Sequence, residues 1–243
     1  MHTPTPQARP SIYYTYEVFK PWLASAHPPQ KRQQVVVVGA GPAGMVTALE
    51  LARHGVASVV LSAELQFSQG SRAICFTRRS MEILQQVGVA DRMTKGGLPW
   101  RFGNSFYRGQ RVFRMEAPHD PDDRFFPIIN VQQQYMEEYL HDACRANPLI
   151  DFRWGNKVTQ VQQKNGYVEL EVDTPEGPYK LESQWVVAAD GGRSCIRTAM
   201  NLDMEGASYE GFFVIADIKI DLPFPTERRA YFDPDWNRGN TIL

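Results

Sequence analysis

The chain has 243 residues, of which 43% are hydrophobic and 22% are charged, a composition typical of a globular protein rather than of a disordered or fibrous one. Its 26 Lys and Arg residues against 27 Asp and Glu residues give a net charge of -1. That balance argues against a nucleic-acid partner, because binding a phosphate backbone requires a surplus of positive charge. No apolar run reaches the roughly 18 residues that predict a membrane span.

The cysteines and histidines show no pattern typical of a disulfide framework or a metal centre. Cys75, Cys144 and Cys195 are far apart and form no Cys-x-x-Cys pair, which suits reduced thiols in the cytoplasm. The five histidines lack the spacing of zinc ligands, so we expect no metal site. The first ten residues are polar and include three prolines, so we expect no secretory leader.

Residues 1–34 predict an extended N-terminal arm, because they are rich in proline, glutamine and aromatic residues and end with Pro28, Pro29 and the pair Lys31-Arg32. Tyr13, Tyr14, Tyr16, Phe19 and Trp22 are available to anchor this arm on the rest of the chain.

The residues after the arm predict a strand–helix–strand unit. Residues 35–38 are four consecutive valines, typical of a strand buried on both faces of a parallel sheet. Residues 45–54 have helical spacing, and Gly55 predicts the end of that helix. Residues 59–61 predict the next strand, which completes a βαβ unit.

Further elements follow in chain order. Residues 80–89 predict a helix ended by Gly88, residues 100–117 a hairpin around Arg108-Gly109-Gln110, and residues 132–145 another helix. Short strands are predicted at 150–154, 157–163, 167–172, 179–181 and 185–189, then a helix at 193–200 and strands at 212–220 and 228–232.

A glycine-rich motif, Gly39-Ala40-Gly41-Pro42-Ala43-Gly44, lies between the first predicted strand and helix. Gly39 permits the tight turn, Gly41 lets backbone N–H groups approach a pyrophosphate, and Gly44 allows close helix–strand packing. The helix N-terminus then faces the phosphates. All six residues are candidate cofactor-binding residues. The motif does not separate NAD from FAD, and a purely structural glycine turn is the alternative.

An acid is expected at the end of the second strand, where it would hold the ribose hydroxyls of the cofactor. Ser62 follows the strand here, and the nearest acid is Glu64. Glu64 would share the face of Ser62 if the strand continued that far, since side chains alternate along a strand. Glu64 is therefore a candidate ligand, and a solvated loop acid is the alternative.

A second constellation follows residues 185–189, which predict a buried strand. Asp190 stands at its carboxyl end, followed by Gly191, Gly192 and a helix that carries Ser194. Open α/β sheets bind ligands outside the carboxyl ends of their strands, so Asp190 and Gly191 are candidate ligand-binding residues. A capped strand–turn–helix is the alternative.

These features together resemble the class A flavin-dependent aromatic hydroxylases of the para-hydroxybenzoate hydroxylase type. Asp190-Gly191 is similar to the second, "DG" fingerprint of that family, and residues 71–76 with 79–84 resemble its 3-(3-hydroxyphenyl)propionate hydroxylase branch. Residues 129–133 are similar as well, and the resemblance covers roughly residues 35–243.

The resemblance implies FAD as the cofactor and NAD(P)H as the co-substrate. The glycines of the motif at 39–44 would contact the ADP half of FAD, and Arg72 would lie near the flavin and the pyrophosphate. Gln133 would reach the cofactor from its helix. Asp190 would bind the ribityl-pyrophosphate region and assist the use of NAD(P)H. The ribose-binding acid of the family falls at Ser62, which is a departure from the pattern.

The reaction implied by the resemblance is hydroxylation of a phenolic ring by a flavin C4a-hydroperoxide that forms from O2. The expected partners are thus a small aromatic substrate and O2, and the protein supplies orientation and a dry pocket. No nucleophile–base triad is recognisable, so no catalytic residue is named.

The resemblance also implies a missing part. The family carries a third, Gly-Asp fingerprint followed by long helices, and neither occurs after Gly191. We expect the sequence to be the N-terminal part of a hydroxylase, whose incomplete sheet would be open to a second chain. A catalytically incomplete FAD-binding fragment, or one half of a split enzyme, is the alternative function. A plain NAD-dependent dehydrogenase would explain the glycine motif but not Arg72 together with Asp190.

The predicted fold class is α/β, a Rossmann-like FAD-binding domain with a parallel sheet and helices plus part of a mixed β-sheet substrate domain, apparently truncated. The predicted domains are an arm at 1–34, an FAD-binding domain at 35–200 with a hairpin insertion near 100–117, and the start of a substrate-binding sheet at 201–243. Phe213, Ile215, Asp217 and Tyr231 are predicted to line the substrate pocket.

Overall fold

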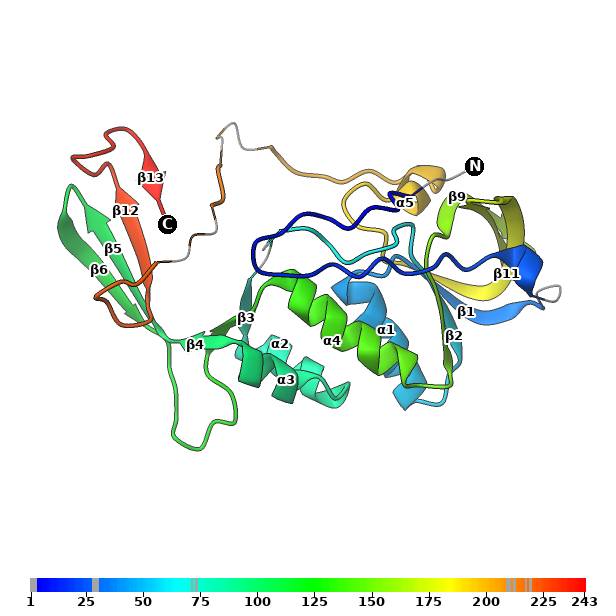
Figure 1. Ribbon diagram of the computed structural model, residues 1–243, viewed down its shortest axis with the longest axis horizontal. Coiled ribbons are helices and arrows are strands. Elements are labelled where there is room, and N and C mark those ends of the chain that lie inside the picture. Colours follow the sequence, from blue (N-terminus) through cyan, green and yellow to red (C-terminus); the bar gives the residue numbers. More distant parts are fainter. Residues whose placement is uncertain are drawn as a thin grey trace. The chain divides into compact units, whose positions relative to one another are not determined.

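The computed structural model describes residues 4–27, 31–70, 72, 74–208, 211, 213–216, 218 and 220–243. The chain divides into two compact units (Figure 1). The first joins Met1–Gly70 with Gln133–Phe212, and the second joins Ser71–Gln132 with Phe213–Leu243.

A six-stranded sheet forms the first unit, with the strand order β8-β2-β1-β11-β10-β9. Strands β8, β2 and β1 pair in parallel, and so does β1 with β11, whereas β11, β10 and β9 pair antiparallel. This sheet confirms the Rossmann-like α/β prediction. Its strands are β1 (Gln33–Val38), β2 (Ser58–Leu61), β8 (Ile150–Arg153), β9 (Lys157–Lys164), β10 (Tyr167–Thr174) and β11 (Gly177–Ala188).

Helices cover this sheet. The helices α1 (Pro42–Arg53) and α4 (Gln133–Arg145) lie side by side; α1 packs against β1, β2 and β8, and α4 packs against β8 (Figure 1). The short helix α5 (Cys195–Ala199) packs against β9. Valines of β1 and β2 are almost completely buried in the core, as the all-valine run predicted.

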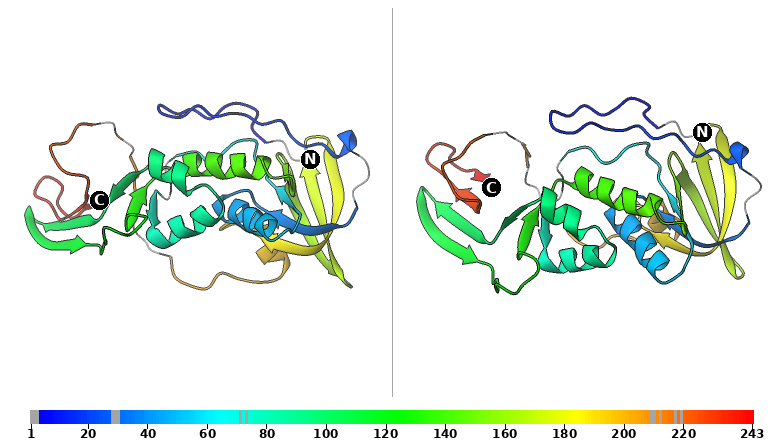
Figure 2. Two further views of the ribbon diagram at one scale, coloured as in Figure 1. Left: turned by 90° about the horizontal axis from the view of Figure 1, so that it is seen from below. Right: turned by 60° about the horizontal axis from the view of Figure 1, so that its bottom comes forward.

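The N-terminal arm follows an extended path along the first unit, apart from the 3-10 turn η1 (Ala24–Ala26) (Figure 2). Tyr16 is 5% exposed and packs with Leu65, Phe67 and Trp154. The ring of Phe19 stacks on the Trp154 ring, with the centroids 4.4 Å apart. The predicted aromatic anchoring of the arm is therefore confirmed.

The second unit contains two small sheets. One has the order β3-β7-β4 and the other the order β13-β12-β5-β6. The hairpin prediction is confirmed, with Arg108 and Gly109 both at positive φ in its turn. The elements are β3 (Cys75–Thr77), α2 (Arg78–Gln86), α3 (Ala90–Gly96), β4 (Leu98–Trp100), β5 (Phe102–Tyr107), β6 (Gln110–Glu116), β7 (Ile128–Asn130), β12 (Arg228–Phe232) and β13 (Thr241–Ile242).

The strands predicted at 179–181 and 185–189 are a single strand, β11. Its first half pairs antiparallel with β10 and its second half pairs in parallel with β1, and Ser183 pairs with both neighbours. The prediction that residues 185–189 are buried is wrong, since Trp185 is 71% exposed. The reason is that α1 and α4 pack over β1, β2 and β8, toward the other edge of the sheet.

The strand predicted at 212–220 is absent from the described residues of that segment. Phe213 and Ile215 are 82% and 75% exposed, so they line no pocket within the described part of the chain, and Asp217 lies outside the described residues. Alternation alone predicted the strand, but a strand also needs a hydrogen-bonded neighbour. Tyr231 does lie in a sheet, where its ring stacks on that of Phe106.

Candidate functional site

The glycine loop at the end of β1 has two glycines that the protein's own backbone requires. Gly39 has a φ of +105°, and a Cβ there would lie 2.2 Å from the carbonyl oxygen of Ala189. A Cβ on Gly44 would lie 1.9 Å from the carbonyl oxygen of Gly39. Both distances are far below a van der Waals contact, so any side chain at either position would displace the backbone.

Gly41 differs from these two. Its backbone is extended, with a φ of -75° and a ψ of 179°, and a Cβ there would meet no protein atom within 4 Å. Gly41 is the N-cap of α1 and supplies no side-chain cap. Open space therefore lies in front of a helix N-terminus, where N–H groups and the helix dipole favour an anion.

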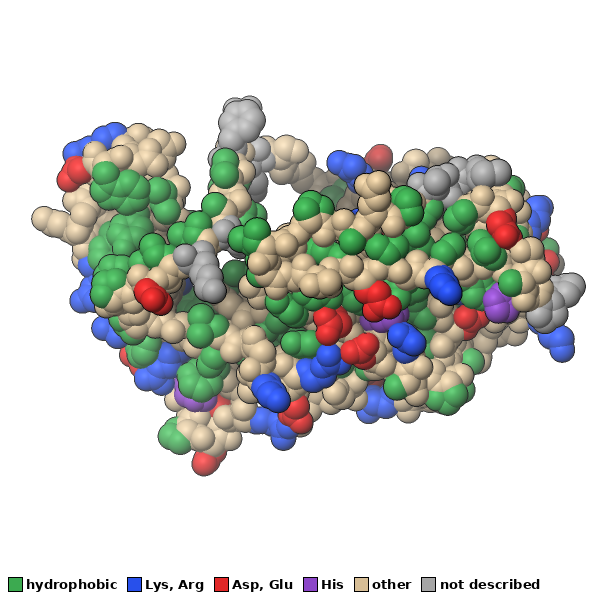
Figure 3. Space-filling view, in the orientation of Figure 1, with side chains coloured by type: hydrophobic (Ala, Val, Ile, Leu, Met, Phe, Trp, Pro, Cys, Tyr) green, Lys and Arg blue, Asp and Glu red, His purple; other side chains and the backbone are tan. Residues whose placement is uncertain are grey.

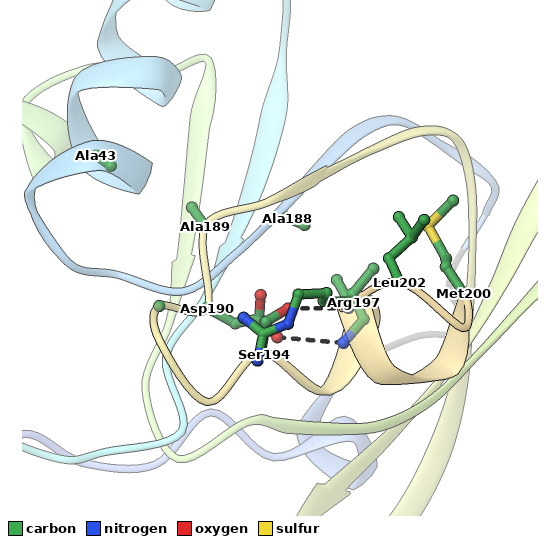
Figure 4. Close-up of a pocket in the computed structure, with 10 residues that line it drawn as sticks. Ala43, Ala188, Ala189, Asp190, Ser194, Arg197, Met200 and Leu202 are labelled. Carbon is green, nitrogen blue, oxygen red and sulfur yellow. Dashed lines mark hydrogen bonds between the residues drawn. The ribbon is translucent and has the colours of Figure 1, made fainter. Parts of the chain in front are cut away.

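A pocket of about 420 Å³ lies in the first unit, between the start of α1, the end of β11 and α5 (Figure 4). Asp190, Ser194 and Arg197 contribute its polar side chains, with Met200 and Leu202 beside them. Two of the predicted motifs, far apart in sequence, thus meet at one pocket. The remaining lining residues are Ala43, Ala188, Ala189, Gly191 and Ile196.

The Asp190 carboxylate holds the start of α5. Its Oδ2 accepts hydrogen bonds from the backbone N–H groups of Cys195, at 2.8 Å, and Ile196, at 3.3 Å. Burial raises the pKa of Asp190, but hydrogen bonds from Ser194 and from the backbone outweigh burial, so that the net pKa lies below its ordinary value. Asp190 therefore combines the capping role with a position on the pocket wall.

Ser194 and Arg197 complete this wall. The Ser194 Oγ, at the N-cap of α5, accepts a hydrogen bond from the Arg197 N–H at 3.0 Å. The Arg197 guanidinium donates to the carbonyl oxygen of Gly192, also at 3.0 Å. The Arg197 cation and the Asp190 carboxylate thus stand on one pocket wall, and Ala43, in the first turn of α1, also lines the pocket.

The carboxyl end of β2 is arranged differently. β2 ends at Leu61, so strand alternation does not extend to Glu64, and Ser62 is 5% exposed. The Glu64 carboxylate pairs with the Arg9 guanidinium of the arm, at 2.9 Å. Arg9 also donates to the carbonyl oxygen of Phe67. Glu64, the acid that follows this strand, therefore already has a partner within the protein, Arg9.

Arg72 and Gln133 are not among the pocket-lining residues. Arg72 belongs to the second unit, where it is exposed and has a left-handed φ of +43°. Gln133 is the first residue of α4, in the first unit, and its amide donates to Glu137 at 2.6 Å.

Two partners of the predicted site residues, Glu137 beside Gln133 and Arg9 beside Glu64, were missed from the sequence. Glu137 stands four positions after Gln133 on a predicted helix, a spacing that places both on one face and offered a usable signal. Arg9 offered none, because its contact with Glu64 joins residues 55 positions apart.

No helix in the described part of the chain combines the length and the apolar character that crossing a membrane requires.

Residues 32–233 match the family described as "FAD binding domain". The para-nitrophenol 4-monooxygenase of Pseudomonas sp. strain WBC-3 is 30% identical over 211 residues, which cover 83% of this chain and 51% of that protein. The 3-(3-hydroxy-phenyl)propionate/3-hydroxycinnamic acid hydroxylase 2 of Burkholderia vietnamiensis is 30% identical over 194 residues, which cover 78% of this chain and 35% of the relative.

Solved structures agree with these relatives. The p-nitrophenol 4-monooxygenase PnpA of Pseudomonas putida DLL-E4 superposes with a TM-score of 0.69 at 29% identity, covering 73% of this chain and 46% of that one. The flavin-dependent monooxygenase PieE, solved with FAD and substrate, superposes with a TM-score of 0.66 at 26% identity. The match covers 74% of this chain and 34% of PieE. The chain thus spans about half the length of some relatives and about a third of others. With more than half of its residues matched, it belongs to the FAD-binding-domain family that includes these aromatic hydroxylases and monooxygenases.

Proposed function

We propose that this chain is the FAD-binding part of an NAD(P)H-dependent monooxygenase that hydroxylates a phenolic compound. The observation that carries the proposal is the open space at Gly41, in front of the N-terminus of α1 and within the first unit that also holds Asp190. The para-nitrophenol and hydroxyphenylpropionate relatives support a phenolic substrate. The free cysteines are compatible with a place in the cytoplasm.

The residues present fit a diphosphate. Gly39 and Gly44 are explained by the protein's own backbone, whereas Gly41 is not, because protein atoms leave its missing side chain unopposed. A glycine in such a position leaves room for a ligand to reach backbone N–H groups. The acid expected for the ribose is the one part that does not fit, since Ser62 is buried and Glu64 is paired with Arg9.

FAD, when bound and reduced by NAD(P)H, would supply the activation of O2 and the transfer of one oxygen atom to the ring. The chain's own residues would bind and orient it. The N-terminus of α1 and the Gly39–Gly44 loop would hold the pyrophosphate, and Asp190 with Gly191 would position the adjoining part of the cofactor. Gln133, in the same unit, would contact it from the start of α4.

The test is the visible absorption of the purified chain after incubation with FAD, followed by NADPH in air. We expect flavin absorption to remain after gel filtration, NADPH to bleach it, and air to restore it. If the protein takes up FAD but neither NADPH nor NADH bleaches the flavin, the proposed FAD binding stands and the proposed NAD(P)H-dependent reaction of this chain is wrong.

The variant Gly41→Val distinguishes a ligand site from a structural turn. Valine adopts the extended backbone found at Gly41, and its Cβ would meet no protein atom within 4 Å, so the variant should fold, with a loss of about 1 kcal/mol or less at the N-cap. Its side chain fills the space in front of α1, so FAD affinity should fall by about 100-fold or more, equivalent to losing several hydrogen bonds. Thr47→Val, on the same helix, is the matched control and should bind FAD normally. Wild-type affinity in Gly41→Val would show that the cofactor lies elsewhere.

A second candidate function is a catalytically incomplete FAD-binding unit that works with a further chain or segment. Apolar side chains cover the sheet of β5, β6, β12 and β13 (Figure 3), and Val112, Phe113 and Trp236 are 63%, 59% and 67% exposed. A contiguous apolar surface is typical of a site that a partner covers, which motivates this candidate. A chain that binds FAD without NAD(P)H consumption, and that gains consumption on adding a co-expressed partner, would favour this candidate.

A further inference from the structure

Glu137, on α4, is a buried carboxylate with a complete set of hydrogen bonds. Its side chain is 4% exposed. Oε2 accepts from the backbone N–H of Ser68 at 2.7 Å, and Oε1 accepts from the Ser68 hydroxyl at 2.9 Å and from the Gln133 side-chain amide at 2.6 Å. A buried carboxylate is costly unless it is hydrogen-bonded, so these contacts fix its orientation.

The chemistry of Glu137 fixes the orientation of Gln133 as well. A carboxylate only accepts hydrogen bonds, so Gln133 must turn its NH2 group toward Glu137. The carbonyl oxygen of the same amide is then turned away from Glu137. Gln133 therefore presents an acceptor to any group that approaches from the other side.

Ser68 is itself held in place by the arm. The Tyr16 hydroxyl donates to the carbonyl oxygen of Ser68 at 3.0 Å, and the Arg9 N–H donates to the Gln66 side chain at 2.9 Å. The segment after β2 is thus bonded to the arm on one side and to α4 on the other. Its backbone N–H at Ser68 is a fixed donor, which leaves Glu137 one possible orientation.

We propose that Glu137 is a positioning residue for the cofactor: it holds the Gln133 amide so that its carbonyl oxygen accepts a hydrogen bond from a hydroxyl of FAD. The inference rests on the proposed function, because the contact between Gln133 and FAD belongs to it. Glu137 itself touches no cofactor atom and acts through Gln133.

The variant Glu137→Gln keeps the shape of the side chain at position 137 and should reverse the orientation of the Gln133 amide. The fixed N–H of Ser68 requires an oxygen at the position of Oε2, so the new NH2 must stand where Oε1 stood, facing Gln133. Gln133 must then turn its own oxygen toward residue 137 and present NH2 outward. The double variant Gln133→Glu with Glu137→Gln restores an outward acceptor, since a carboxylate at 133 accepts from the amide at 137.

FAD affinity is measured for the full chain by quenching of flavin fluorescence, and folding by thermal melting. We expect Glu137→Gln to weaken FAD binding by about tenfold, because Gln133 would lose one hydrogen bond to the cofactor. The melting temperature should be almost unchanged. The double variant should recover to within about threefold of the wild type. Glu138→Gln is the matched control, since a glutamine oxygen can still accept the hydrogen bond that the Tyr14 hydroxyl donates to Glu138, and it should bind FAD normally.

The orientation of the Gln133 amide can also be measured without FAD. The 1H–15N spectrum of the apoprotein should show a strongly shifted side-chain NH2 signal of Gln133, assigned by its loss in Gln133→Ala. Glu137→Gln should return that signal to the ordinary range. An unshifted signal in the wild type overturns the inference, even if the chain takes up no FAD.

Gln133→Ala separates failure of the inference from failure of the proposed function. Reduced FAD affinity in Gln133→Ala with normal affinity in Glu137→Gln overturns the positioning role and leaves the cofactor contact intact. Normal affinity in Gln133→Ala overturns the contact itself, and the positioning role with it. Weak binding in Glu137→Gln that the double variant does not restore overturns the amide-orientation argument.

Discussion

The carboxyl ends of β1 and β2, which pair side by side, are built in opposite ways. The end of β1 is shaped by three glycines within six residues, and it leaves open space at Gly41. Beyond the end of β2, an arm residue, Arg9, pairs with the acid that follows the strand, Glu64. A short local motif thus determines one strand end, and a long-range contact determines the other. The difference shows that two neighbouring strand ends in one sheet can be specified by unrelated parts of a sequence.

The largest effect is expected at the end of β1. Gly44→Val should destabilise the protein by about 4 kcal/mol or more, because its Cβ would lie 1.9 Å from the backbone oxygen of Gly39. Urea denaturation measures the loss. Stability equal to that of Gly41→Val would show that the two glycines are equivalent, which would break the distinction between structural and ligand-facing glycines.

Acid should destabilise the protein through His141 on α4, whose ring lies against Phe19 of the arm. Burial, with a smaller effect of Arg145 that Asp142 opposes, lowers the pKa of His141 to about 4 from 6.5, and its Nε2 accepts from the Trp154 indole. The unfolded chain binds the proton more readily, so the contribution is complete above pH 6.5 and is lost as the pH falls toward 4, by up to about 3 kcal/mol.

The measurement for His141 is the free energy of unfolding between pH 8 and pH 4. His141→Gln keeps an acceptor for the indole and does not titrate, so the difference in slope isolates the histidine. Equal slopes in the two proteins would mean that His141 protonates as easily in the folded state as in the unfolded one.

Asp190→Ala tests the pocket wall that Asp190 forms with Ser194 and Arg197. Loss of the two backbone hydrogen bonds at the start of α5 should cost about 1 to 2 kcal/mol and should also weaken FAD binding. Asp190→Asn retains one acceptor oxygen and should recover most of the stability. Since the folded pKa is lowered, the wild-type advantage should be present above pH 3.8 and vanish as the pH falls below it. An advantage that grows in acid would contradict this sign.

The smallest effect is expected at the end of β2. Arg9→Ala should cost about 1 kcal/mol or less, because Glu64 is 54% exposed and such ion pairs are weak. The difference from wild type should shrink in about 1 M salt, where exposed charges are screened. A loss that is unchanged by salt would mean that the hydrogen bond to Phe67, rather than the ion pair, holds the arm.

The sequence by itself determined the features whose conformation is local. The turn at Gly39, the helix stop at Gly55 and the hairpin turn at Arg108-Gly109 follow from backbone conformations that few residues adopt, and all three were predicted. The run of valines in β1 and the apolar residues of β2 likewise predicted strands buried in a parallel sheet, and these valines are buried.

Only the tertiary structure decided the features that depend on distant partners. Strand β11 is continuous because two different strands pair with its two halves, which no period in its own sequence reveals. The pairing of Arg9 with Glu64 and of Glu137 with Ser68 joins residues 55 and 69 positions apart. Such contacts arise when the chain packs, and hydrophobic periodicity carries no information about which polar groups then meet.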